Sequence, residues 1–181
     1  QPVPAVSTNP KFLILYGRPK AGKTSALAQL PNNLIIDLEG GSQFIDAMAV
    51  QARSVGDLGE IAQAIRAKNS EAGHNFYKHI TIDNATRLEE MCLPYAKTLY
   101  MQTPMGKNYK GDDVRTLPGG SGYMYLRQAV RKVLDMFKSL CDEFILIGHV
   151  KDVQIEQNGE ELSQMALDLV GKLGSIVCGE A

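Results

Sequence analysis

A glycine-rich turn between a buried strand and a helix is the feature that most constrains the fold of this chain. Residues 12–16, Phe-Leu-Ile-Leu-Tyr, are apolar or aromatic throughout, which is typical of a buried strand. They lead directly into Gly17-x-x-x-x-Gly22-Lys23-Thr24, and residues 25–30 are predicted to continue as a helix. A strand, this spacing and a helix in that order predict a phosphate-binding loop, whose backbone N–H groups point inward and cradle an anion.

The positions of this turn have distinct expected parts in binding a nucleotide. Gly17 and Gly22 suit places where a side chain would block the phosphate or where positive φ is needed. Lys23 supplies a positive charge to the β- and γ-phosphates, and the Thr24 hydroxyl supplies an oxygen ligand for Mg²⁺. The predicted nucleotide-binding residues are the whole turn and the residue after it: Gly17, Arg18, Pro19, Lys20, Ala21, Gly22, Lys23, Thr24 and Ser25.

Three further apolar stretches each end in polar residues. The stretch 33–41 closes with Asp37, Glu39 and two glycines, His79–Asp83 closes with an aspartate, and Glu143–His149 closes with a histidine. Parallel strands deliver the residues at their carboxyl ends to one edge of a sheet. We therefore expect these polar groups to meet beside the phosphate-binding loop.

Helical patterns separate these strands, at 44–50, at 57–68, from Asn84 to about Tyr100, and at 125–141. Strands alternating with helices predict an α/β fold with a mostly parallel sheet flanked by helices. The domain is expected to span 11–181, after a proline-rich flexible arm at 1–10 and with a truncated C terminus. The glycine-rich stretch 101–122 has no period, and a loop of this length is usually functional or disordered.

Composition narrows the classes of protein that fit. A length of 181 residues is enough for one domain with a proper core. The net charge of −1 argues against holding nucleic acid by bulk charge, so such binding would need a local basic surface. Three cysteines without C-x-x-C spacing indicate reduced thiols in a cytoplasmic protein. No apolar run approaches the length of a membrane span, and no signal peptide is recognised.

Carboxylates at the strand ends are candidates for the chemistry. Asp83 is the expected Mg²⁺ ligand from a second strand, with a simple helix cap as its alternative. Glu39 is the expected group that orients or deprotonates the attacking water, because two glycines after it leave space. Asp37 is an alternative base, although its position within the strand favours orienting a neighbour.

Taken in order, four motifs resemble the core motifs of RecA-family recombinase ATPases. More closely, they are similar to the small phage-encoded, core-only members used in single-strand annealing and recombination. The likeness covers about residues 11–178 and implies a three-layer P-loop NTPase fold with a RecA-like core. The motifs are Gly17–Thr24, Ile36-Asp-Leu-Glu-Gly40, Ile80-Thr-Ile-Asp-Asn-Ala-Thr86 and Ile145-Leu-Ile-Gly-His-Val150.

The resemblance assigns catalytic roles. In that family the glutamate of the second motif is the catalytic base, which points to Glu39, and the aspartate of the third assists Mg²⁺, which points to Asp83. The residue closing the next strand senses the γ-phosphate; the family usually has glutamine there, whereas this chain has His149. Either side chain can donate to a phosphate oxygen, and a buried structural histidine is the alternative. Glu39, Lys23 and His149 form the expected catalytic set, and Thr24 and Asp83 are the expected metal ligands.

Two loops of the family face single-stranded DNA in the centre of a ring or filament. By position they correspond to 101–122 and 151–164. The second is acidic, which favours an ordinary solvated loop, and a solvated loop is also the alternative for the first. The first offers three cations for phosphates and one ring for stacking: Lys107, Lys110, Arg115 and Tyr109.

The resemblance also implies ATP and Mg²⁺ as ligands and a homo-oligomer, ring or filament, with ATP at subunit boundaries. Lys172 is then expected to reach a neighbour's γ-phosphate, and a single-strand-binding protein is a further expected partner. Base preference has no short signature, so the sequence leaves ATP versus another nucleotide open.

Three alternative functions can be judged by whether the sequence contains the residues that each of them requires. A nucleotide kinase needs a lid with several arginines, and the one candidate loop has Arg115 alone. A GTP-dependent switch usually carries Asn-Lys-x-Asp, which does not occur. A nucleotide-binding structural or packaging subunit with little turnover stays open, and the near-neutral charge slightly favours it.

Overall fold

The computed structural model describes residues 11–40, 47–157, 160–169 and 172–179. Its strands are β1 (Phe12–Gly17), β2 (Asn33–Asp37), β3 (Ala49–Gln51), β4 (His79–Asp83), β5 (Glu143–Gln157) and β6 (Glu160–Leu167). Its α-helices are α1 (Lys23–Ala28), α2 (Val55–Ala72), α3 (Ala85–Met91), α4 (Leu93–Met101), α5 (Ser121–Lys138) and α6 (Leu173–Gly179). Two short 3₁₀ helices, η2 (Val114–Thr116) and η3 (Pro118–Gly120), precede α5.

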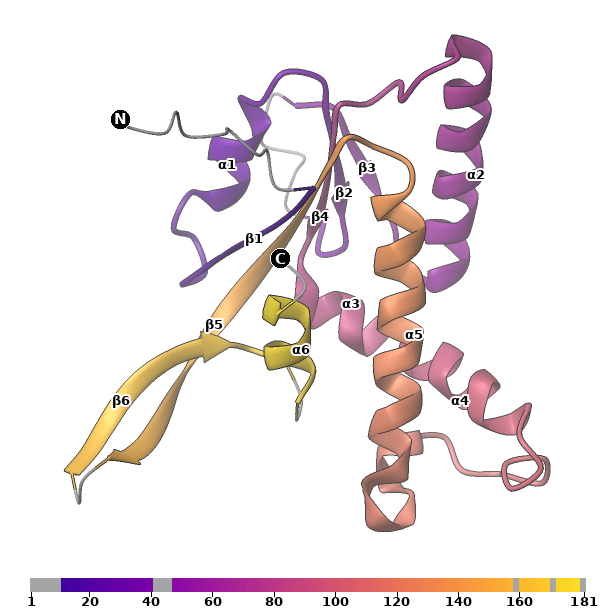
Figure 1. Cartoon of the computed structure of the whole chain (residues 1–181), viewed down its shortest axis with the longest axis vertical. Coiled ribbons are helices and arrows are strands. Elements are labelled where there is room, and N and C mark those ends of the chain that lie inside the picture. Colours follow the sequence, from indigo (N-terminus) through magenta and orange to yellow (C-terminus); the bar gives the residue numbers. More distant parts are fainter. Residues whose placement is uncertain (1–10, 41–46, 158–159, 170–171, 180–181) are drawn as a thin grey trace, which may run out of the picture.

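Parallel pairing joins β1, β5, β4, β2 and β3, in that order across the sheet. The strand that carries His149, β5, therefore lies between β1, which leads into the phosphate-binding loop, and β4. Beyond the sheet, β5 continues and pairs antiparallel with β6, from Val150 opposite Leu167 to Gln157 opposite Glu160. The result is a hairpin that projects away from the helices (Figure 1).

Helices cover both faces of the sheet, α1 on one side and α2 and α5 on the other (Figure 1). Alternate residues of β5 serve the two faces: Ile145 and Ile147 pack with Leu27 of α1, whereas Phe144 and Leu146 belong to the larger core. Such strands, buried on both faces, explain the continuous apolar runs in the sequence. The predicted α/β class, with a mostly parallel sheet flanked by helices, is confirmed.

Local sequence signals set the ends of α2. The Ser54 side chain accepts from the Asp57 backbone N–H, and the Asp57 carboxylate accepts from the Ser54 N–H in return. Gly73 ends the helix with φ of 73°. These two signals make the helix longer at both ends than the predicted 57–68.

The predicted helix at 44–50 is wrong where the structure describes it, and 41–46 lie outside the described residues. Ala49–Gln51 form β3, because the backbone of this segment pairs with β2. Ile35 N donates to Met48 O at 2.8 Å, and Ala52 N donates to Asp37 O at 3.1 Å. Pairing along the sheet outweighed a short apolar pattern that fits either kind of element.

The predicted helix from Asn84 to about Tyr100 is divided in two. α3 ends at Met91 and α4 begins at Leu93, with Pro94 in its first turn. Proline has no N–H to donate to the preceding turn and is accepted at a helix start, so it separates the two segments.

Two stretches expected to be loops are more regular than that. Residues 101–122 contain η2, η3 and the first residues of α5, which begins at Ser121 rather than at 125. Residues 151–164 were expected to form a DNA-facing or solvated loop, and that prediction is wrong in backbone terms, because they lie mostly in the β5–β6 hairpin. Among the helices that the structure describes, none is long and apolar enough to cross a membrane.

Candidate functional site

The carboxyl ends of three strands lie side by side, as parallel pairing requires. Gly17, the first residue of the loop, pairs with His149 on β5. Asp37 at the end of β2 pairs with Asp83 at the end of β4, and Asp83 in turn pairs with Ile147, two residues before His149. The sheet thus delivers all the predicted polar groups to one edge.

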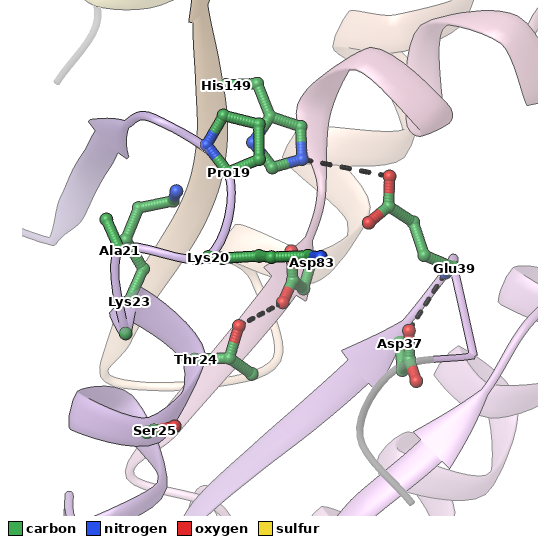
Figure 2. Close-up of a pocket in the computed structure, with 11 residues that line it drawn as sticks. Pro19, Lys20, Ala21, Lys23, Thr24, Ser25, Asp37, Glu39, Asp83 and His149 are labelled. Carbon is green, nitrogen blue, oxygen red and sulfur yellow. Dashed lines mark hydrogen bonds and ion pairs between the residues drawn. The ribbon is translucent and has the colours of Figure 1, made fainter.

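A cavity of about 450 Å³ opens at this edge. Most of the predicted nucleotide-binding turn lines it, together with the predicted acids and the histidine, and Figure 2 shows their side chains. Its lining residues are Pro19, Lys20, Ala21, Gly22, Lys23, Thr24, Ser25, Asp37, Glu39, Asp83 and His149. We call it the nucleotide cavity.

The loop is held open by its own backbone and by Lys23. Gly22 has φ of 78° and Lys20 has φ of 60°, so glycine suits the first position and the second is strained. The Lys23 ammonium donates to Gly17 O at 3.0 Å and to Arg18 O at 2.8 Å. Gly17 and Arg18 do not line the cavity, but their carbonyls position the lysine that does.

Thr24 and Asp83 are joined across the cavity floor. The Thr24 hydroxyl donates to Asp83 Oδ2 at 2.5 Å. Burial raises the pKa of the Asp83 carboxyl above its ordinary value of 3.8; the hydrogen bond from Thr24 opposes this, and the nearby charges of Glu39 and Asp37 add to it. A carboxylate in such a place is stabilised by a cation.

The donor set fits Mg²⁺ bound together with a nucleotide. No group of three or more His, Cys, Asp or Glu side chains in the described ranges could hold a metal alone. Mg²⁺ commonly takes one or two protein oxygens and completes its shell with water and substrate phosphates. Thr24 and Asp83, the residues predicted for the metal, place two such oxygens beside the loop.

Asp37 shapes the turn that carries Glu39. Its carboxylate is buried, at 3% exposure, and Oδ1 accepts from the backbone N–H groups of Glu39 at 2.9 Å and Gly40 at 2.8 Å. These bonds match the orienting part considered for Asp37 and not a base that meets water. The Glu39 side chain is half exposed and reaches over the cavity from the side opposite the loop (Figure 2).

His149 has competing neighbours at one ring nitrogen. Its Nε2 lies 2.9 Å from Asn84 Nδ2 and 3.8 Å from Glu39 Oε1. Asn84 Oδ1 accepts from Arg87 N at 2.9 Å, so the amide's donor side is the one that faces the ring. Nε2 therefore accepts, and the neutral ring carries its proton on Nδ1. That Nδ1 is buried and has no hydrogen-bond partner among the described residues.

Asn84 is the site residue that sequence reasoning missed. It is fully buried, caps α3 and orients His149 through one side chain. The sequence signal for the cap, an Asx residue directly before a helix, was present at this position. Nothing in the sequence showed that the amide's other end meets a residue 65 positions away.

The residues predicted to bind DNA lie at the far end of α4 and α5, away from the loop (Figure 1). Two of them are already engaged: Tyr109 donates to Asp113 O at 2.8 Å and packs on the Tyr100 ring, and Arg115 forms a multiple contact with the Asp113 carboxylate, at 2.6 Å in its shortest bond. Lys107 and Lys110 are exposed.

Lys172, the residue predicted to act on a neighbouring subunit, is exposed and directly precedes α6. Its carbonyl accepts from the Ser175 hydroxyl and from Ile176 N. The predicted action of Lys172 on a neighbouring subunit stays a prediction, as does DNA binding by Lys107, Tyr109, Lys110 and Arg115.

In the second segment predicted to face DNA, the Lys151 ammonium donates to Leu169 O at 3.1 Å and lies 3.3 Å from Asp168 Oδ1.

Comparison with known families places the chain in one of them. A family model described as an AAA domain matches residues 9–181 of the chain, which includes every residue of the nucleotide cavity. A search of curated proteins found no match. Because the model covers nearly the whole chain, the protein belongs to the AAA domain family, with a P-loop NTPase-type domain.

Proposed function

We propose that this protein is a magnesium-dependent ATPase that binds single-stranded DNA as a cytoplasmic homo-oligomer, in phage-type recombination, annealing or replication. The observation that carries the hydrolytic half is the nucleotide cavity. One space is lined by the phosphate-binding loop, by the Thr24–Asp83 pair and by Glu39, which lies across from the loop (Figure 2). A triphosphate on the loop would present its γ-phosphate to a water beside the glutamate.

The chain's own groups divide the work of hydrolysis. Water attacks the γ-phosphorus, the bond to the β-phosphate oxygen breaks, and the products are ADP and inorganic phosphate. Glu39 takes the proton from the water. Lys23 leaves its carbonyl partners for phosphate oxygens and, with the loop N–H groups, neutralises the charge that builds up. Mg²⁺, when bound by Thr24 and Asp83, adds positive charge to the phosphates.

The His149 ring leaves the Glu39 carboxylate free because its Nε2 faces Asn84. While Asn84 donates to Nε2, that nitrogen has no proton for Glu39, and the 3.8 Å separation is too long for a hydrogen bond. The Glu39 carboxylate then remains available to water. The Nδ1 proton lacks an acceptor in the described structure, and a phosphate oxygen is a suitable one.

The DNA and oligomer halves of the proposal draw on the resemblance to RecA-type recombinases and on one structural link. The strand that carries His149 continues without a break into the projecting β5–β6 hairpin. A change at the γ-phosphate can therefore be passed along one strand to a surface outside the core. A nucleotide-binding structural or packaging subunit is the outcome if turnover is absent.

Phosphate release with and without an oligothymidylate tests the proposal. We expect Mg²⁺-dependent release that the oligonucleotide stimulates, loss of nucleotide binding or turnover in Lys23→Ala, and no change in the exposed control Lys11→Ala. ATP binding without release would overturn the ATPase half. Release that ignores DNA, with no retention of the oligonucleotide at low salt, would overturn the DNA half.

A further inference from the structure

A second cavity adjoins the nucleotide cavity on the far side of the Glu39 turn. It has a volume of about 420 Å³ and shares Asp37 and Glu39 as lining residues with the nucleotide cavity. Arg53 and Arg87 line its outer part, and both also line a third cavity of about 340 Å³. The second and third cavities therefore make one trough, which we call the Arg53–Arg87 groove.

The charge of the groove is set by which partners its side chains already have. The Arg53 guanidinium forms no hydrogen bond or ion pair with any residue in the described ranges. The Asp57 carboxylate accepts from the Arg53 backbone N–H, and this bond, together with the nearby Arg53 charge, lowers the pKa of Asp57. Arg87 pairs with Glu90 at 2.7 Å, but the two side chains are 46% and 55% exposed. An ion pair so exposed contributes little and exchanges readily for a stronger partner.

Three acids also line the groove, and each of them already has a partner. Glu90 pairs with Arg87. Asp37 is buried and accepts from two backbone N–H groups of its own turn. Glu39 leans toward His149 in the nucleotide cavity. The Arg53 guanidinium, and that of Arg87 once it leaves Glu90, are the groups that the groove offers to an anion, and guanidinium forks match the oxygens of a phosphodiester.

The groove also offers an aromatic wall. Tyr95 of α4 lines its third-cavity end, half buried, next to Met91 and Pro94. Cations for the backbone beside a ring for a base are the elements that bind single strands without sequence preference. Two joined cavities form a trough longer than a single phosphate needs.

We propose that the Arg53–Arg87 groove binds a single nucleic acid strand, with phosphates on the two arginines and a base against Tyr95. This inference rests on the DNA half of the proposed function and places the strand away from Lys107 and Lys110. Because Glu39 lines both cavities, a phosphate in the groove repels its carboxylate toward the nucleotide. Strand binding would thereby favour hydrolysis.

Anisotropy of a labelled oligothymidylate, measured over a range of salt, tests the groove. Arg53→Ala and Arg87→Ala are each expected to weaken binding about 10-fold and to reduce the salt slope by about one. Glu90→Gln, which frees Arg87, is expected to tighten binding about 2-fold. Arg66→Ala, an exposed arginine elsewhere on α2, serves as the matched control and should bind like the wild type.

The outcomes separate this inference from the function beneath it. Wild-type retention that survives Arg53→Ala and Arg87→Ala but is lost in Lys107→Ala with Lys110→Ala would overturn the groove and leave DNA binding intact. No retention by the wild type at low salt would overturn both. Circular dichroism of each variant guards against loss of fold, which is not expected because both arginines are exposed.

Discussion

The two edges of the same parallel sheet treat their polar residues in opposite ways. At the amino edge, His79 is buried and each ring nitrogen lies within hydrogen-bond distance of an oxygen, Pro31 O at 2.9 Å and Glu143 Oε2 at 3.1 Å. Asn33 donates to Leu27 O at 2.9 Å and accepts from the Thr81 hydroxyl at 3.0 Å. These buried groups are satisfied within the chain, as stability requires.

At the carboxyl edge the polar groups are less evenly matched. The pKa of Asp83 is raised by burial and by the neighbouring acids, and His149 Nδ1 is buried without a partner in the described structure. The Lys23 ammonium has only backbone carbonyls as its hydrogen-bond partners among the described residues. The difference teaches that one edge is built for folding, and the other keeps capacity for a ligand at a cost in stability.

Glu39→Gln tests the carboxyl edge, and we expect it to have the largest effect of the substitutions considered. Turnover should fall about 10²–10⁴-fold, because the amide cannot accept the proton from water. Nucleotide binding should persist, since Lys23, Thr24 and Asp83 are untouched. Phosphate release and fluorescent-nucleotide binding measure the two effects. The exposed Glu60→Gln is the control, and equal turnover in the two variants would remove Glu39 as the base.

Asn33→Ala tests the amino edge. Removing its amide takes away one of the two hydrogen bonds of the Leu27 carbonyl, which also accepts from Leu30 N, and removes the acceptor of the buried Thr81 hydroxyl. The free energy of unfolding should fall by about 1–3 kcal/mol, with nucleotide affinity of the folded protein unchanged. Urea unfolding checks the first expectation and a binding titration the second. The exposed Asn108→Ala should do neither, and a selective loss of nucleotide binding in Asn33→Ala would contradict the division between the edges.

The Asn84 side chain both caps α3, which stabilises the fold, and contacts His149 at the site; two substitutions separate these roles. Asn84→Asp keeps the acceptor that caps α3 but cannot donate to His149 Nε2; Asn84→Ala loses both. Turnover should fall roughly 10-fold in both variants, whereas only the alanine variant should lose about 1 kcal/mol of stability from the cap. Nitrogen NMR shifts of the His149 ring report the tautomer directly. Unchanged shifts in Asn84→Asp would show that the asparagine does not set it.

Asp83→Asn should change the stability of the nucleotide-free protein by the smallest amount, and the sign of that change is informative. Because the pKa of Asp83 is raised in the folded state, its contribution to stability is fully present below the ordinary value of 3.8 and is lost as pH rises through the folded value. At neutral pH the nucleotide-free Asn variant should therefore be more stable, by roughly 0.5–1 kcal/mol or about 1–4 °C in Tm.

Thermal melts of wild type and Asp83→Asn between pH 4 and pH 8 check this. The gap should narrow toward the acid end, and Mg²⁺ with ATP should stabilise only the wild type. A variant less stable than the wild type at neutral pH would show that the Thr24 hydrogen bond to the carboxylate outweighs its burial.

Much of the fold followed from periodicity and much of the site from spacing. The strand segments 33–37, 79–83 and 143–149 were recognisable because they are buried on both faces and their sequences are therefore mostly apolar. The β3 segment and the division at Pro94 were missed, because a three-residue strand has too little pattern and helix termini depend on packing.

The sequence alone determined the phosphate-binding loop and the identity of the acids that could serve it, because these depend on residue type and on spacing along one strand, turn or helix. The tertiary structure alone decided that Asn84 faces His149 and that Arg53 and Arg87 share a groove beside the Glu39 turn. Such contacts join residues from separate elements. Their partners are chosen by strand order and helix packing, which no local pattern records.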